Sequence, residues 1–237
     1  MIGVLAVGLG LGGVGQFVET YFATTWVADR QAADEVSEFR HVVADSPQRG
    51  AELHTDLAAF PPPVVDTSGD DAWGLLVVPS WRDSAGAYGE VADGAIPVKE
   101  GTGAAVLNSG AAGHYTHTVG PGEIGNMSLA AHRRTYGDSF LRLDQLQPGD
   151  VVGVETAEAW FVYVVTAHDV VDPSQWQVTA PVPGQPGAEP AERYLTLTTC
   201  HSLTRGAWGN DHRWVVHGSL LGWVEHDAGV PDVLVGA

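Results

Sequence analysis

The sequence contains few basic residues and almost no cysteine. Eleven Lys and Arg face 29 Asp and Glu in 237 residues, which gives a formal net charge of −18 at pH 7, and Lys99 is the sole lysine. Nucleic-acid affinity depends on basic side chains that replace the counterions of the phosphates, so this composition argues against a nucleic-acid partner. The single cysteine, Cys200, permits no intramolecular disulfide. The hydrophobic core must therefore hold the fold, and the solitary thiol is a candidate reactive group.

The first 18 residues lack charged side chains altogether. Glu19 is the one charge among the first 27 residues, and roughly 20 mainly apolar residues are enough to span a bilayer. We predict a single-pass transmembrane signal-anchor helix over residues 1–27, with the following domain outside the cell; a cleaved signal peptide is an alternative. Because no Lys or Arg precedes the run, we expect a basic leader upstream of Met1.

A glycine pattern in the same segment permits a different interpretation. Gly10, Gly12 and Gly15 match the G-x-G-x-x-G fingerprint of dinucleotide-binding folds, and Glu35 stands 20 residues beyond Gly15. That fingerprint requires alternating strands and helices around it, whereas a polar helix, prolines and short strands follow here. We therefore disfavour a nucleotide site and expect no cofactor.

The next segment is predicted to connect the anchor to a folded domain. Apolar residues recur at helical spacing from residue 28 to about residue 52, and Pro47 is expected to end the helix. Three consecutive prolines at 61–63 exclude a regular element there. We interpret residues 28–70 as a juxtamembrane helix and Pro-rich stalk, and residues 71–237 as the folded domain.

This domain is predicted to be mainly β. Short apolar or alternating runs, separated by Gly, Pro, Asn and Asp, are typical of strands that close a barrel or form a sandwich. The predicted strands cover residues 73–81, 125–132, 150–156, 159–171, 194–200 and 213–225. One helix-like segment covers residues 139–146, and a Pro- and Gly-rich loop, residues 181–191, precedes the cysteine strand.

Two of these strands direct chemically useful residues away from their apolar faces. Successive side chains alternate across a strand, so two leucines and Thr199 share one face of the cysteine strand, while two threonines and Cys200 share the polar face. His132 likewise falls on the less apolar face of the strand that it ends. Arg213 follows the cysteine by thirteen residues and alternates with Trp214. The histidine, the cysteine and the arginine all lie at strand ends, where loops can open a groove.

His132, Cys200 and Arg213 together are suited to acyl transfer through a thioester. A cysteine becomes a strong nucleophile as its thiolate, which a nearby imidazolium or guanidinium favours. A histidine can protonate a departing amine, and an arginine can hold a carbonyl oxygen as it gains negative charge. The alternative to a catalytic cysteine is a structural one, because lone cysteines commonly pack as small hydrophobic residues.

Five other histidines are relevant to the chemistry of the site. His114 and His117 indicate a metal only weakly, because no Cys or carboxylate cluster stands beside them at ligand spacing, and we predict no metal site. His201, His212 and His217 lie close in sequence to the cysteine or the arginine and are candidates for a supporting role.

Several blocks of the sequence resemble those of sortases. Residues 196–200 read TLTTC and are similar to the sortase TLxTC signature, with Arg213 near the spacing of the sortase arginine. Four upstream blocks resemble the "GHYPGT", "PGE.GN", "AGHR.TYG" and "LDELRPGD" motifs of class E sortases from actinobacteria. They are residues 113–115, 121–126, 131–137 and 143–150. The resemblance covers most of residues 73–225.

Three positions depart from the class E pattern. Ala131 stands where a Gly usually precedes the histidine, Ser202 where a Pro is usual, and Thr116-His117 where Pro-Gly is usual. The methyl group of Ala131 narrows the freedom of the backbone beside the histidine, and Thr116-His117 changes one wall of the substrate groove. We expect both changes to bear on activity and specificity.

The resemblance implies a mainly β fold, an eight-stranded sortase-type β-barrel with short helices, preceded by the transmembrane helix. Such enzymes are membrane-anchored cysteine transpeptidases that cleave a C-terminal sorting signal of the LPxTG type, or LAxTG in class E, between Thr and Gly. The acyl chain passes to an amino group of a lipid-linked peptidoglycan precursor. The partners expected are therefore exported proteins that carry a sorting signal, the cell-wall precursor and the membrane.

The resemblance also assigns roles to individual residues. Cys200 attacks the Thr carbonyl, Arg213 steadies the oxyanion, and His132 serves as acid and base. Residues expected to contact the substrate are Tyr115, Thr199 and Leu107.

Two further interpretations within this fold stay open. A pilin-polymerising sortase would share the three catalytic residues but carry a lid upstream of the barrel, and no Asp-Pro-aromatic lid sequence occurs between residues 50 and 90. A non-catalytic sortase-like binding module would keep the fold but fail to react with a thiol-directed analogue of the sorting signal.

Overall fold

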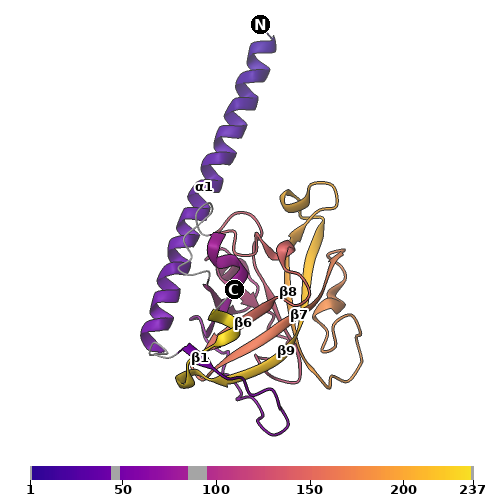
Figure 1. Ribbon diagram of the computed structural model, residues 1–237. Helices are drawn as coiled ribbons and strands as arrows, with labels where there is room; N and C mark the ends of the chain where they lie inside the picture. The colour runs from indigo at the N-terminus through magenta and orange to yellow at the C-terminus, as the bar shows by residue number, and fades with distance from the viewer. Residues whose placement is uncertain (1, 44–48, 85–94, 236–237) are drawn as a thin grey trace.

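A long N-terminal helix lies along one side of a β-barrel and extends beyond it (Figure 1). The computed structural model describes the backbone of residues 2–43, 49–84 and 95–235, and the side chains of residues 21–43, 50–81 and 95–235. The helix, α1, spans Ile2–Val42.

Eight strands close the barrel in the order β2-β3-β4-β5-β8-β9-β7-β6, and β6 pairs with β2 to complete the ring. The strands are β2 (Gly74–Val77), β3 (Ala95–Glu100), β4 (Ala112–His114), β5 (Gly125–Ala130), β6 (Val151–Thr156), β7 (Ala159–Val171), β8 (Arg193–His201) and β9 (His212–Glu225). The pairs β3–β4 and β5–β8 are parallel, and the other neighbouring pairs are antiparallel. The prediction of an eight-stranded, mainly β barrel is confirmed.

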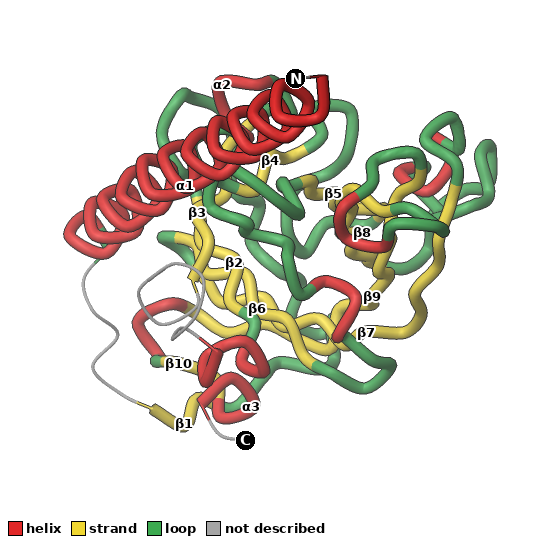
Figure 2. Tube along the Cα trace, turned by 90° about the horizontal axis from the view of Figure 1, so that it is seen from above, coloured by secondary structure: helices red, strands yellow, loops and turns green. Residues whose placement is uncertain are grey.

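Short elements complete the described part of the chain. They are α2 (Ala104–Leu107), α3 (Asp232–Val235), the strands β1 (Arg49–Ala51) and β10 (Val230–Pro231), and the 3-10 turns η1 (Pro79–Ser84), η3 (Leu143–Gln145), η4 (Trp176–Thr179), η5 (Gly206–Trp208) and η6 (His226–Ala228). Figure 2 shows α2 close to α1 at one edge of the barrel.

The six predicted strands correspond to β2 and to β5 through β9. β2 is shorter than predicted, because Pro79 begins the 3-10 turn η1. β3 contains Pro97 and β4 consists of Ala-Gly-His, so neither has the alternating pattern that identifies a strand from sequence. Of the helix-like segment 139–146, the structure forms only the 3-10 turn η3.

The inward-facing side chains of the strands fill the barrel with one apolar cluster. Leu76, Val98, Met127, Leu129 and Leu197 belong to it and are each 0% exposed. Burial of this apolar surface is the main force that holds the fold, since the single cysteine forms no disulfide.

One face of α1 packs on the outside of the barrel. Ala28, Ala32, Val36, Phe39 and, just past its end, Val43 follow one another at three or four residues and are all buried. The last three join a second apolar cluster that contains Leu75, Val77, Trp160, Val162, Val224 and Leu234. The stretch predicted as a separate juxtamembrane helix is therefore part of the continuous helix α1, and this apolar stripe packs it against the barrel.

The segment expected as a stalk also lies against the barrel. β1 pairs in parallel with β10, and His54 forms an antiparallel bridge with Trp223 of β9. The indole Nε1 of Trp223 donates to the carbonyl oxygen of Phe60 at 2.9 Å. The contacts with Trp223 attach the segment to the barrel strand β9, and the β1–β10 pair forms a separate two-stranded sheet with the C-terminal segment.

The membrane-anchor prediction for residues 1–27 rests mainly on residues 1–20, whose side chains lie outside the described ones. Among the described residues, no helix is both long enough and apolar enough to cross a membrane. From Tyr21 onward α1 contacts the folded domain, so the predicted boundary at residue 27 falls inside the docked part of the helix. The three glycines of the alternative fingerprint lie within α1, and a dinucleotide site would need a strand and a turn there.

Candidate active site

The parallel pairing of β5 and β8 brings His132 beside Cys200. Ala130 pairs with Thr198 in register, and His132 and Cys200 each follow by two residues. The register continues past the end of β5, because the amide of Ala131 donates to the carbonyl oxygen of Thr198 at 3.3 Å. On the other side of β8, Cys200 is the direct cross-strand partner of Arg213. All three predicted catalytic residues therefore meet at one end of the β5-β8-β9 sheet.

The two faces of β8 separate the core from the site, as the alternation predicts. Leu195 and Leu197 lie in the barrel core. On the opposite face, Thr198 Oγ1 hydrogen-bonds the hydroxyl of Tyr115 at 3.1 Å, and the half-buried Cys200 follows on the same face. The thiol is thus a partly accessible group on a polar surface, which does not fit the alternative of an inert core cysteine.

His132 has a partner that orients its ring. Its Nε2 lies 2.9 Å from Oδ1 of Asn108, and because an amide oxygen only accepts hydrogen bonds, Nε2 is the protonated nitrogen in the neutral ring. Nδ1 is then the nitrogen available to take up a proton. The ring of Tyr136 stacks on the imidazole at 5.3 Å between centroids. Burial lowers the pKa of His132, and the negative charge of Asp138 opposes that shift.

Arg213 is tied to the β8–β9 loop. Its Nη1 donates to the carbonyl oxygens of Asn210 at 2.8 Å and His212 at 2.9 Å. Both bonds use one nitrogen of the guanidinium, so the remaining N–H groups of the planar fork can donate to a substrate oxygen.

The three residues expected to bind substrate differ in their surroundings. Tyr115 is half-buried on the polar face beside Thr198. Leu107, at the end of α2, is half-buried against Gly113 of β4. Thr199 is 2% exposed, and its hydroxyl donates to the carbonyl oxygen of Ala131 at 2.8 Å. The expectation for Thr199 is therefore corrected: this side chain faces inward and holds the residue before His132.

Arg133 is a residue of the site that sequence reasoning did not single out. Although it is only 2% exposed, its guanidinium forms an ion pair with Asp144 and a hydrogen bond with Nδ1 of His201. Its Nη1 also lies 3.5 Å from the carbonyl oxygen of Cys200. Arg133 thereby links the chain beside His132 to the end of β8. Its place inside the block 131–137 was an available signal, whereas Asn108 lies in no motif.

The three histidines near the cysteine have different roles. His201 accepts from Arg133, and burial together with that guanidinium lowers the pKa of His201. His212 pairs with the exposed Asp211 at 3.1 Å. His217 lies on β9 four residues beyond Arg213. Its Nδ1 lies 3.0 Å from Thr196 Oγ1. His201 is bonded to Arg133, which flanks His132, and His212 is the cross-strand partner of His201.

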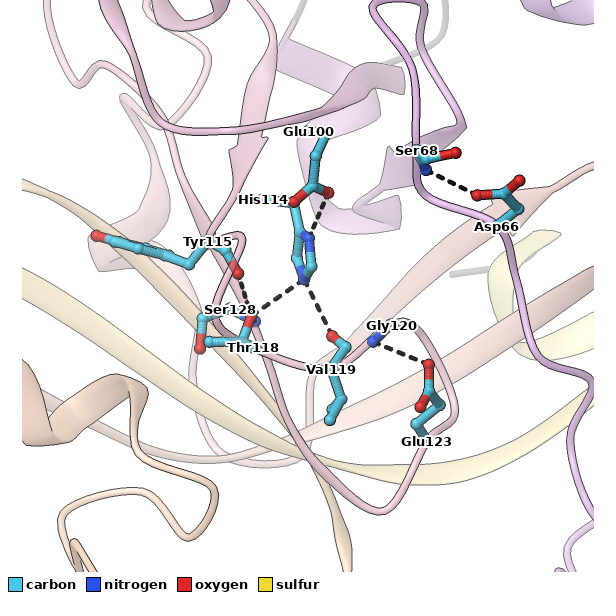
Figure 3. A network of polar contacts seen from close by, with 10 residues as sticks. All are labelled: Asp66, Ser68, Glu100, His114, Tyr115, Thr118, Val119, Gly120, Glu123 and Ser128. Atoms are coloured by element: carbon cyan, nitrogen blue, oxygen red, sulfur yellow. Dashed lines mark hydrogen bonds and ion pairs between the residues drawn. The ribbon is translucent and has the colours of Figure 1, made fainter.

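His114 has a structural role instead of a metal-binding one. Figure 3 shows its ring between Glu100 and the loop that follows β4. Nδ1 lies 2.7 Å from Glu100 Oε2, and Nε2 lies 3.0 Å from both the carbonyl oxygen of Val119 and Oγ1 of Thr118. Both ring nitrogens are thus engaged by protein groups. In the part of the chain that the structure describes, no cluster of three or more His, Cys, Asp or Glu residues could hold a metal ion.

The three departures from the class E pattern also have visible surroundings. The methyl group of Ala131 lies in the barrel core. Ser202 Oγ accepts from the amides of Thr204 and Arg205, which closes the turn after β8. His117 Nε2 lies 3.2 Å from Thr179 Oγ1 and so attaches the β4–β5 loop to the long loop between β7 and β8.

Comparisons with known proteins agree with this geometry. A family model described as a sortase domain matches residues 90–221. Sortase SrtE1 of Streptomyces coelicolor is 37% identical over 150 residues, which cover 60% of this chain and 42% of the relative. Sortase SrtE2 of the same organism is 36% identical over 138 residues, 55% of this chain and 53% of the relative. The chain spans about half the length of these curated relatives.

Two solved structures are similar over nearly their whole length. The SrtA sortase from Actinomyces oris has a TM-score of 0.68 and 47% sequence identity, and the match covers 75% of this chain and 96% of that one. Sortase E1 from Streptomyces coelicolor, with a tripeptide in its active site, has a TM-score of 0.58 and 34% identity, and covers 69% and 96% respectively.

Proposed function

Because the chain belongs to the sortase family, we propose that it is a cysteine transpeptidase that cleaves a C-terminal LAxTG- or LPxTG-type sorting signal between Thr and Gly. The observation that carries the proposal is the register of β5, β8 and β9, in which His132, Cys200 and Arg213 are neighbours at one end of the sheet. The similarity to sortases SrtE1 and SrtE2 supports the class E assignment.

The proposed first step forms a thioester. The Cys200 thiolate attacks the Thr carbonyl carbon, and the carbonyl oxygen becomes an oxyanion that N–H groups of Arg213 stabilise. The imidazolium of His132 then gives its proton to the departing Gly amine as the C–N bond breaks. The products are an acyl-enzyme on Cys200 and a free amine.

The proposed second step transfers the acyl chain. An amino group of the acceptor attacks the thioester carbonyl, His132 takes the proton that the amine loses, and Cys200 leaves as a thiolate. The acceptor that we propose is an amino group of a lipid-linked peptidoglycan precursor, and the donors are exported proteins with a sorting signal.

We propose that the enzyme works at the outer face of the cell membrane. The support is the uncharged run over residues 1–18 and the direction of α1, which continues past the barrel on its N-terminal side (Figure 1). The anchor in this proposal precedes Tyr21, since the helix is docked on the barrel from there onward. Protease treatment of intact cells tests the location: the barrel is expected to be digested, and a protected barrel would contradict it.

Peptide assays distinguish the proposal from its two alternatives. The full chain is incubated with LAxTG and LPxTG peptides in parallel, with and without a peptidoglycan-type amine. Cleavage between Thr and Gly and ligation to that amine are the expected results. Preferred ligation to a lysine side chain of a pilin-type peptide would favour a pilin-polymerising sortase. Failure to cleave either peptide would favour a non-catalytic binding module.

A further inference from the structure

We propose that α1 forms part of the support of the active site, and that Tyr21 and Asp138 are positioning residues for His132. The role assigned to His132 rests on the proposed function. Tyr21 lies on α1 and Asp138 on the loop that follows His132, 117 residues apart in sequence, and the Tyr21 hydroxyl donates to Oδ2 of Asp138.

The loop that follows His132 has an unusual backbone. Thr135, Tyr136, Gly137 and Asp138 are consecutive and have φ angles of 70°, 51°, 88° and 50°. Side chains other than glycine rarely adopt positive φ, and a β-branched threonine does so least readily. Such a conformation persists only where its surroundings hold it in place.

α1 supplies those surroundings for the loop. Asp138 is 4% exposed beneath the helix and accepts the hydrogen bond of Tyr21. About two turns further along α1, Asp29 approaches the same loop so closely that a Cβ atom on Gly137 would lie 3.1 Å from its Oδ1. Two side chains of the helix thus contact the loop that carries Tyr136, whose ring stacks on His132.

α1 also packs closely against a second segment beside His132, the loop that contains Asn108 and Gly110. A Cβ atom on Gly110 would lie 2.9 Å from the carbonyl oxygen of Ala28 and 3.2 Å from Cβ of Ala32. Gly110 follows Asn108, the hydrogen-bond partner of His132, by two residues. The small side chains of Ala28 and Ala32 allow this close approach, and both are buried.

The loop after His132 and the loop of Asn108 are also bonded to each other. Ser139 Oγ donates to the carbonyl oxygen of Gly110 at 2.6 Å, so the loop after His132 and the loop of Asn108 form one unit. Both sources of contact with the imidazole, the amide of Asn108 and the ring of Tyr136, belong to this unit. A displacement of α1 is therefore transmitted to the ring on both sides.

The electrostatics agree with a tight contact. Asp138 faces Tyr21, Asp29, Arg134 and His132. Burial raises the pKa of Asp138, and burial together with the charge of Asp138 raises the pKa of Asp29 to about 6. Among the described residues, no hydrogen-bond partner reaches Oδ1 of either carboxyl group. The charge of Asp138 also acts on His132 directly and opposes the lowering of its pKa by burial.

The decisive variant is Tyr21→Phe in the full-length chain, which removes one hydroxyl and keeps the ring. We expect kcat for peptide cleavage to fall roughly 10- to 100-fold with KM within about twofold, because a small misplacement of a catalytic group costs that much. The pKa of His132, followed by NMR with labelled histidine and assigned with His132→Gln, is expected to rise toward its ordinary value as the loop loosens and water enters.

Four further variants separate positioning from simple loss of stability. Tyr163→Phe deletes a buried hydroxyl of the barrel core that accepts from the amide of Gly122 at 2.8 Å, and we expect it to lower stability without changing kcat or the pKa of His132. Asp138→Asn keeps an acceptor for Tyr21 and tolerates positive φ, so it is expected to retain more activity than Asp138→Ala. Ala32→Leu, a wedge under α1, is expected to repeat the effect of Tyr21→Phe.

The NMR measurement does not depend on turnover, so the two proposals can fail separately. If the wild type cleaves no sorting-signal peptide but Tyr21→Phe still shifts the pKa of His132, the function is wrong and the positioning role stands. If Tyr21→Phe and Ala32→Leu leave kcat and the pKa of His132 as in the wild type, the positioning role is overturned.

Discussion

The two faces of β8 show how one strand serves both the fold and the chemistry. On the inner face Leu195 and Leu197 are 2% and 0% exposed and belong to the apolar core. On the outer face Thr196 and Thr198 hydrogen-bond polar groups of neighbouring strands and loops, and Cys200 follows half-buried on the same face. Because the side chains alternate strictly, a substitution on one face need not disturb the other. The comparison predicts that stability and catalysis can be changed separately along a single strand.

The largest effect is expected on the outer face, from Cys200→Ala. Removal of the proposed nucleophile should lower peptide cleavage by roughly 1,000-fold or more, because the proposed thioester could not form. Since the side chain is not part of the core, the thermal unfolding midpoint should stay close to that of the wild type. Parallel measurement of turnover and thermal unfolding checks both statements. Cleavage at the wild-type rate would remove Cys200 from the mechanism.

The opposite result is expected on the inner face, from Leu197→Ala. Loss of a fully buried leucine should lower the free energy of unfolding by about 2–5 kcal/mol. Activity per folded molecule should remain near the wild-type level, because the side chain points away from Cys200. Urea unfolding and active-site titration measure the two quantities. A folded Leu197→Ala variant without peptide cleavage would contradict the prediction that the inner face affects stability alone.

Thr199 is an inner-face residue that is expected to affect both stability and catalysis. It faces inward, but its hydroxyl donates to the carbonyl oxygen of Ala131, the residue before His132. Thr199→Val keeps the shape and leaves this buried acceptor without its donor, which should cost about 1–3 kcal/mol and also lower kcat. Thr166→Val is the matched control, because the exposed Thr166 hydroxyl donates to the carbonyl oxygen of His217 at 3.1 Å. An equal effect of both variants on kcat would deny Thr199 any link to the site.

The smallest effect concerns the pH dependence of the outer face. Burial lowers the pKa of His217 from 6.5, with Asp169 opposing, and Thr196 Oγ1 lies 3.0 Å from its Nδ1. The unfolded chain therefore binds more protons just below pH 6.5, so stability is lost as pH falls from there through the lowered pKa. His217→Gln should flatten the change in unfolding free energy between ~pH 5 and ~pH 8, whereas Leu197→Ala should not. An unchanged pH dependence in His217→Gln would contradict this assignment.

Much of the fold and the central residues of the site could be predicted from the sequence, because both depend on local patterns. Alternation identified the long strands and put Cys200 on the polar side of β8. Strand-end position and acyl-transfer chemistry grouped it with His132 and Arg213, and the sortase resemblance then implied a role for each. The packing of α1 on the barrel could not be predicted, since the contact of Tyr21 with Asp138 joins residues 117 apart. Asn108 was missed for a related reason: it caps a four-residue helix and meets His132 only through the tertiary fold.

Thr199 shows the limit of a family motif as a guide to roles. It lies inside the TLxTC-like run and was expected to contact the substrate, whereas the structure buries it and its hydroxyl donates to the backbone beside His132. A motif records which residues a site requires, and only the geometry distinguishes a residue that meets the substrate from one that holds the site together.

The central claim, that Cys200 is the nucleophile of a sortase, is tested most directly by the intact mass of the full-length protein mixed with a LAxTG peptide and no amine acceptor. The account predicts an acyl adduct on Cys200 that adds the mass of the peptide up to its Thr less one water. Hydroxylamine should cleave this adduct, and Cys200→Ala should lack it. Peptide cleavage without an adduct on Cys200, or an adduct on another residue, would contradict it.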